Sequence, residues 1–231
     1  NGENLHRMDI YGASLSARLA WAGGQTAAGA NIRREHILST SYGDLLEEDR
    51  WHDISGSSRV YDHEGKRTCT SLFLEHNVSI GGFRLSAGVM ADRNTGLDNS
   101  FRFYPGVDAS YRPDNHWTIF ASWNKAMRIP TYTELYVSSA AQQGSTALKP
   151  EKNTTLKAGL RYRRPEWEAT VSMMRNFGRD LIDWVYESEE STKYQALNIG
   201  KVDNTGLTFD LSARPDLLTG CPVFTGVKVS Y

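Results

Sequence analysis

The feature that most constrains this sequence is an alternation of apolar and polar residues with a period of two, recurring along its length. In FRLSAGVMADR (83–93) every second side chain is apolar and most of those between are polar. The same pattern occupies residues 101–112, 154–164 and 207–214. Successive side chains of a β-strand point to opposite faces of its sheet. The alternation therefore predicts strands with one apolar and one polar face, and it indicates no helix.

The connections between the predicted strands fall into two classes that alternate along the chain. Short turns rich in Gly, Pro, Asn and Asp occupy 22–25, 81–82, 113–115, 164–165 and 214–222. Longer polar segments occupy 41–66, 94–100, 129–151 and 187–193. We expect about ten strands between them, at residues 7–21, 25–41, 67–80, 83–93, 101–112, 116–128, 152–164, 166–186, 194–213 and 223–231.

This arrangement of connections favours one fold class over the others. A soluble β-sandwich has no need to gather its short turns at one end and its long loops at the other, whereas an up-and-down outer-membrane barrel does. The wet interior of a large barrel also accommodates the charged residues of the polar face, while lipid covers the apolar face. The sequence thus predicts an all-β protein, an antiparallel up-and-down transmembrane β-barrel.

Composition is compatible with this fold and argues against several functions. The chain has 231 residues and a formal net charge of -1, so its bulk charge gives no reason to expect a nucleic-acid partner. It contains no CxxC, HExxH, GxSxG or Gly-rich phosphate-loop motif, and its histidines lack metal-ligand spacing. We therefore predict no enzymatic activity, no cofactor and no metal site.

Four segments carry a resemblance to a known family. FASWNKAMRIPTYTELY (120–136) and LKPEKNTTLKAGLRY (148–162) resemble a strand exit and the following strand entry of TonB-dependent outer-membrane receptors. RNFGRDLIDWVYE (175–187) and YQALNIGKVDNTGLTFDLSA (194–213) resemble later phrases of the same family. The resemblance covers about residues 70–231, and it is greatest to cobalamin and siderophore receptors.

The resemblance implies a barrel of about 22 strands, of which this chain supplies part. It also implies a plug domain inside the barrel, a scarce ligand bound by outward loops, and import powered through the TonB protein. Residues 1–231 are then expected to be a partial barrel domain without the plug, the TonB-interacting N-terminal region or the C-terminal strands. The expected location is the bacterial outer membrane, with three partners: a nutrient such as an iron chelate or cobalamin, the TonB complex, and membrane lipid.

Candidate ligand contacts come from the two longest polar segments, 41–66 and 129–151, because binding residues concentrate on loops that a rigid scaffold holds. Aromatic faces, amides and charged groups there suit a large, partly apolar ligand. A solvated loop is the alternative for 41–66, and a structural role at the strand exit is the alternative for Arg128, Pro130 and Glu134. The predicted contacts are Trp51, His52, Arg128, Tyr132, Glu134, Tyr136, Gln142 and Gln143.

Two other functions remain open at this level. A passive porin or outer-membrane adhesin uses the same strand pattern and would lack the plug domain. A soluble β-sandwich, serving as an enzyme or binding domain, would be monomeric without detergent.

Overall fold

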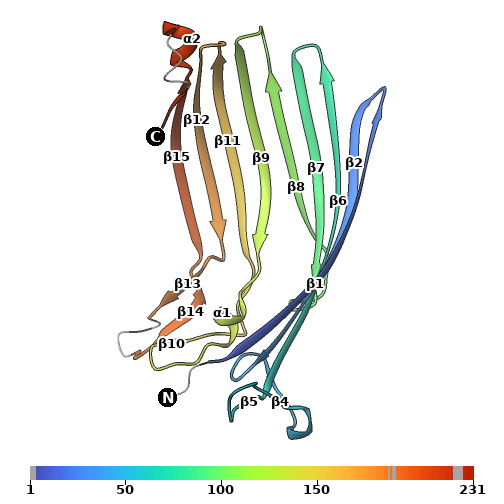
Figure 1. Cartoon of the computed structure of the whole chain (residues 1–231), viewed down its shortest axis with the longest axis vertical. Helices are drawn as coiled ribbons and strands as arrows, with labels where there is room; N and C mark the ends of the chain where they lie inside the picture. Colours follow the sequence, from blue (N-terminus) through green and yellow to red (C-terminus); the bar gives the residue numbers. More distant parts are fainter. Residues whose placement is uncertain (1–3, 187, 189–190, 221–225) are drawn as a thin grey trace.

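A computed structural model of the chain describes residues 4–186, 188, 191–220 and 226–231. Its main feature is an eleven-stranded sheet in which β3 (Asp44–Leu45) pairs beside β6, and the other strands follow one another in chain order (Figure 1). Those strands are β1 (His6–Trp21), β2 (Gly24–Ser39), β6 (His63–Ile80), β7 (Phe83–Asn94), β8 (Arg102–Tyr111), β9 (Trp117–Arg128), β11 (Glu151–Arg163), β12 (Trp167–Arg179), β15 (Lys201–Ala213) and β16 (Val227–Ser230).

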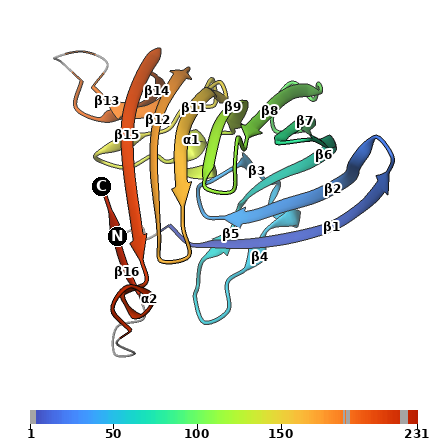
Figure 2. The same cartoon turned by 90° about the horizontal axis from the view of Figure 1, so that it is seen from above.

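Every pairing between neighbours in this series is antiparallel. The sheet curves into an open arc, which Figure 2 shows from above. Among the described residues, β1 and β16 are the two edges of the arc and have no further neighbour. An antiparallel up-and-down wall of this kind is an arc of a barrel, which confirms the predicted fold class.

The strand register separates polar from apolar side chains. Ser14, Asn31, Ser71, Asp92 and Arg102 stand opposite one another across five adjacent strands, and the Ser71 hydroxyl donates to Asp92 at 2.6 Å. The next row, displaced by one residue, is Leu15, Ala30, Leu72, Ala91 and Phe103. Because alternate residues face opposite sides, these rows define the polar face and the apolar face of the wall.

The connections divide between the two ends of the wall largely as predicted, except that the segment expected as a short turn at 214–222 carries a helix and is part of a longer connection between β15 and β16. At the turn end, β1 joins β2 and β6 joins β7 through glycine turns in which Gly24 and Gly81 have positive φ values of 133° and 56°. The loop end, at the bottom of Figure 1, carries the short elements. They are η1 (Glu48–Arg50), β4 (His52–Asp53), β5 (Val60–Tyr61), α1 (Tyr132–Tyr136), β10 (Gln142–Gln143), β13 (Ile182–Val185) and β14 (Tyr194–Asn198).

The structure corrects the expectation that the chain has no helix. Besides η1 and α1, it contains α2 (Pro215–Thr219), which begins with proline at a first-turn position and ends at Gly220, whose φ is 70°. Helices this short span too few turns to produce a 3.6-residue pattern. No helix among the described residues is long and apolar enough to span a membrane.

Several strand boundaries also differ from the prediction. The strand expected over 166–186 is divided between β12 and β13 at Asp180, a non-glycine residue with a φ of 54°. The strand expected over 194–213 is divided between β14 and β15 at Gly200, with a φ of 83°. β6 begins at His63 rather than at residue 67. Of the strand expected over 223–231, residues 223–225 lie outside the described residues.

Two glycines on the polar face lie beneath phenylalanine rings of the neighbouring strand. A Cβ built on Gly29 would lie 2.4 Å from the ring of Phe73, and one on Gly159 would lie 2.5 Å from the ring of Phe120. A Cβ on Gly159 would also approach the backbone oxygen of Val171 to 2.6 Å. These aromatic–glycine pairs are therefore tightly packed parts of the wall.

We expect Gly159→Val to destabilise the wall by about 1–3 kcal/mol, because a backbone atom would have to move. Gly206→Val is the matched control, since nothing lies within 4 Å of its built Cβ. Urea midpoints of the full-length protein compare the two. Equal midpoints for both variants would contradict the expectation.

Candidate ligand-binding site at the loop end

The loop that follows β9 begins with a short capped helix. Pro130 cannot donate a ladder hydrogen bond, so it ends the strand pairing. Thr131 then caps α1: its hydroxyl accepts a hydrogen bond from the Glu134 N–H at 3.2 Å. The Glu134 carboxylate in turn accepts from the Thr131 N–H at 2.7 Å. This capping box explains why the segment turns into a helix immediately after leaving the wall.

Arg128 joins the strand exit, the helix and the returning strand. Its guanidinium donates two hydrogen bonds of 3.0 Å to Glu134, and its Nε donates to Glu151 at 2.9 Å. Glu151 also accepts from the backbone N–H of Ile182 at 2.9 Å. Partial burial opposes ionisation of Glu134, but hydrogen bonds from Arg128 and Thr131 outweigh it and lower its pKa. The positive charge of Arg128 is therefore paired with the carboxylates of Glu134 in α1 and Glu151 in β11.

A second arginine ties the loop to a distant part of the wall. Arg67 of β6 donates from Nη1 to the backbone oxygen of Pro130 at 2.8 Å. Its guanidinium also lies 4.5 Å from the centre of the Tyr132 ring. The same side chain is ion-paired with Glu35 of β2, whose other oxygen lies 2.8 Å from Arg33. The loop after β9 thus crosses the concave side of the arc to β2 and β6, consistent with the position of α1 in Figure 2.

A small hydrophobic cluster lies beneath this contact. Tyr132 packs against Ile37, Tyr42 and Val137. In the described residues its buried hydroxyl has no hydrogen-bond partner. Burial raises the pKa of Tyr132 to about 12, so the phenol stays neutral at physiological pH. Tyr136 and Trp184 cover the outside of the cluster. The helix is therefore held by apolar packing as well as by the two arginines.

Beyond the helix, three short strands form a separate sheet, in which β14 pairs with both β10 and β13. Gln142 pairs with Tyr194, and the Tyr186 and Tyr194 rings lie 4.2 Å apart. These rings are 52% and 41% exposed, whereas Tyr132 is buried. The pair is the kind of aromatic surface that binds a partly apolar ligand. Neither tyrosine was predicted as a contact from the sequence, although both flank the polar segment 187–193.

Comparison with known proteins identifies the family. The sequence matches the family described as TonB dependent receptor-like, beta-barrel over residues 2–231. The chain belongs to this family. TonB-dependent receptors are bacterial outer-membrane proteins and a family of receptors rather than enzymes. The predicted family and location are thus confirmed. No curated protein sequence matches the chain.

Solved receptor structures share the fold at low sequence identity. The siderophore receptor PirA of Pseudomonas aeruginosa matches with a TM-score of 0.72 and 18% identity over 97% of this chain and 41% of its own. A ferric enterobactin receptor mutant of the same organism, in complex with enterobactin, gives 0.69 and 18% over 98% and 35%. The FrpB iron transporter of Neisseria meningitidis gives 0.64 and 20% over 90% and 33%. The chain spans less than half of each receptor.

In this receptor chain the predicted contact residues occupy three separate places. Arg128, Tyr132, Glu134 and Tyr136 lie together at α1, where the first three are engaged in the internal contacts described above. Gln142 and Gln143 lie in β10, beside the tyrosine pair. Trp51 and His52 lie at the β4–β5 hairpin, at the lower right of Figure 1, away from β10.

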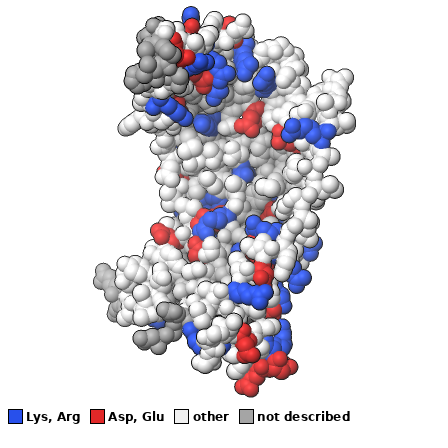
Figure 3. All heavy atoms as spheres, viewed as in Figure 1, with Lys and Arg blue, Asp and Glu red and all other residues white. Residues whose placement is uncertain are grey.

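The hairpin loop differs in character from the tyrosine site. The Trp51 indole donates to the backbone oxygen of Leu46 at 3.1 Å, while its side chain stays exposed. Acidic side chains gather at this end of the molecule in Figure 3. No group of three or more His, Cys, Asp or Glu residues suited to a metal ion occurs in the part of the chain that the structure describes. The two loop regions therefore offer aromatic and polar contacts, with no described metal centre.

Proposed function

We propose that this chain is the loop-bearing part of the barrel in an active outer-membrane importer of a scarce nutrient. Residues 1–231 form a partial barrel domain in this proposal. The plug domain and the region that contacts the TonB complex belong to other parts of the protein. Family membership supports this function, as does the position of the loops after β2, β7, β9 and β12 at one end of the wall.

Among the nutrients open to the family, we propose an iron–siderophore chelate rather than cobalamin. The names of the similar solved structures, a siderophore receptor, a ferric enterobactin receptor and an iron transporter, support this choice. The observation that carries the proposal is the exposed Tyr186–Tyr194 pair beside Gln142. Aromatic rings and an uncharged amide suit a chelate whose outer surface is organic and partly apolar.

Arg128 and Arg67 have a supporting role in this proposal. They hold α1 against the wall, so that the segment leading to Gln142 and Gln143 starts from a fixed position. Binding groups on a rigid support lose less conformational entropy when the ligand arrives. Tyr136 at the outer side of the cluster, with Trp51 and His52 on the hairpin, are proposed as secondary contacts.

The test uses the full-length receptor in a strain that lacks its own copy. Growth is compared with ferric enterobactin, cobalamin or haem as the limiting nutrient, and binding is measured by fluorescence quenching. We expect growth and binding with the ferric chelate. The double variant Tyr186→Ser and Tyr194→Ser should weaken binding about tenfold or more, because two aromatic contacts are lost.

The double variant Tyr186→Phe and Tyr194→Phe is the matched control, since it keeps both rings and should retain most of the affinity. A heat-dependent gel shift confirms that each variant is folded. Growth on cobalamin or haem alone would overturn the iron–siderophore proposal. Unchanged binding by the serine variant would remove the tyrosine pair from the site.

A further inference from the structure

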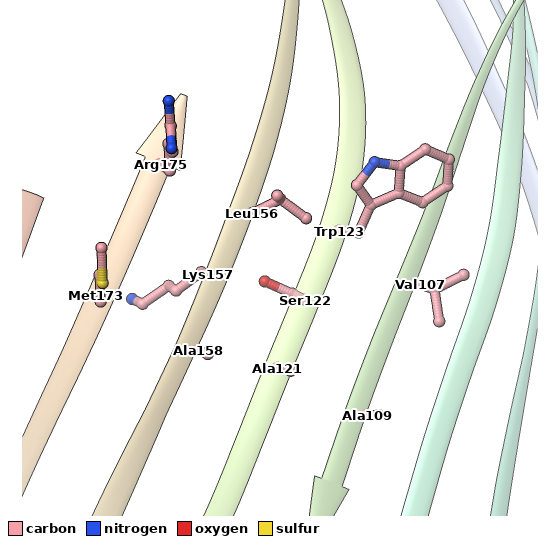
Figure 4. Close-up of a pocket in the computed structure, with 10 residues that line it drawn as sticks. All are labelled: Val107, Ala109, Ala121, Ser122, Trp123, Leu156, Lys157, Ala158, Met173 and Arg175. Atoms are coloured by element: carbon pink, nitrogen blue, oxygen red, sulfur yellow. The ribbon is translucent and has the colours of Figure 1, made fainter. Parts of the chain in front are cut away.

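The apolar face carries a groove that the nutrient-binding proposal does not use. It has a volume of about 460 Å³ and crosses β8, β9, β11 and β12 (Figure 4). Its floor is a row of three alanines, Ala109, Ala121 and Ala158, which the register places directly opposite one another. Alanine side chains are short, so the wall is thin along this row.

Large side chains border the alanine row on both sides. Toward the loop end, the next row on the apolar face contains Val107, Trp123, Leu156 and Arg175, all of which line the groove. Toward the turn end, the next row contains Tyr111, Ile119, Leu160 and Val171. The groove is therefore a product of strand register, with one row of small side chains between two rows of large ones.

Two cations lie toward the loop end of this groove: Arg175 lines its border, and Lys125 lies one row beyond that border. Arg175 ends the bordering row, and its guanidinium lies 4.9 Å from the centre of the Phe177 ring. Lys125 lies two residues beyond Trp123, with its ammonium 5.8 Å from the centre of the indole ring. Both cations are exposed, and no ion pair joins either of them to a carboxylate among the described residues. The nearest outward carboxylate in the register, that of Asp203 opposite Phe177, is not paired with them.

A cation on the lipid-covered face of a barrel is costly unless it reaches a polar headgroup. Arg175 and Lys125 lie on the side of the groove nearer the loops. In a receptor whose long loops face outward, that side is the outer leaflet. An anionic phosphate on a lipid headgroup matches the two cations in charge, and an acyl chain matches the apolar groove beneath them.

We propose that this groove is a specific binding site for a phosphorylated glycolipid of the outer leaflet. One acyl chain lies along the Ala109–Ala121–Ala158 row, and Arg175 and Lys125 bind a phosphate of the headgroup. The site is separate from the tyrosine pair and would stabilise the strands from β8 to β12 from outside.

The experiment measures lipid retained by the purified full-length receptor, using native mass spectrometry with added diphosphoryl lipid A. We expect the double variant Arg175→Gln and Lys125→Gln to bind it about tenfold or more weakly, through the loss of two cations. Ala121→Leu should also weaken binding by filling the groove. Arg34→Gln and Ala30→Leu, on β2 and outside the groove, are the matched controls and should bind like the unaltered receptor.

Three outcomes would overturn the inference. The first is equal binding of fully dephosphorylated lipid A, which would remove the role of the phosphate. The second is unchanged binding by both groove variants. The third is complete competition by millimolar inorganic phosphate, which would indicate a site for a free anion rather than a lipid. The assay contains no nutrient, so its result is independent of whether the iron–siderophore proposal holds.

Discussion

Replacing Arg67 by methionine in the full-length receptor is expected to destabilise the docking of α1 on the wall by about 3 kcal/mol. The substitution keeps the length and apolar character of the side chain but removes its charge. Glu35 would then retain only Arg33, and the carbonyl of Pro130 would lose its donor. The Arg67 and Glu35 side chains are only 14% and 8% exposed, so solvent screens their interaction weakly.

Hydrogen exchange of the backbone amides in residues 131–137 measures this loss directly. The free energy of local opening should fall in the variant, while the protection of β7 and β8 stays unchanged. Arg34→Met is the matched control, because Arg34, which precedes Glu35 on β2, points to the apolar face and away from α1. Equal protection of α1 in both variants would show that Arg67 does not hold the loop.

The sequence was sufficient to predict the wall because the alternation within each strand separates the side chains that face lipid from those that face the barrel interior. The alternation in 83–93 identifies which side chains face lipid without any knowledge of neighbouring strands. Breaks in the pattern are harder to predict. Asp180 adopts a positive φ that is uncommon for a residue with a side chain, and this divides β12 from β13. The one-turn helix α1 gives no periodic signal, although Thr131 and Glu134 have the spacing of a capping box.

The arrangement of the loop end was predicted only in part, because its central contacts join residues far apart in the chain. The segment 129–151 was identified correctly as a loop between two strands. Tyr132 and Glu134 were predicted from the sequence as ligand contacts, whereas the structure shows both in internal contacts. Arg67 was not considered, since its contact with Pro130 spans 63 positions and arises from the curvature of the wall.

The tyrosine pair illustrates the same limit. Tyr186 and Tyr194 meet where β13 pairs with β14, and Gln142 joins them only because β14 also pairs with β10 from a different loop. Strand pairs of two residues leave no pattern that a sequence can reveal. The anchored helix and β10 share one loop, so the rigidity provided by Arg67 and Arg128 extends toward the proposed binding surface. Loss of the contacts that Arg67 and Arg128 make with α1 and its loop should therefore weaken nutrient binding, although the proposed contact residues themselves are unchanged.

The second large effect is expected at Tyr132, where Tyr132→Ala should cost about 3–5 kcal/mol of docking free energy by leaving a cavity in the cluster with Ile37 and Val137. Tyr132→Phe is the matched control. The Tyr132 hydroxyl has no described hydrogen-bond partner, so removing it should change the docking free energy by less than about 0.5 kcal/mol.

The same exchange measurement can separate packing from the cation–π contact with Arg67. In a double-mutant cycle, Tyr132→Ala and Arg67→Met should be less than additive, because each removes the partner of the other. The effects of Tyr132→Phe and Arg67→Met on the docking free energy should be nearly additive, since phenylalanine keeps the ring face. A strong loss in Tyr132→Phe alone would instead mean that the hydroxyl has a hydrogen-bond partner in the membrane-inserted receptor, and that the anchor is polar at its centre rather than apolar.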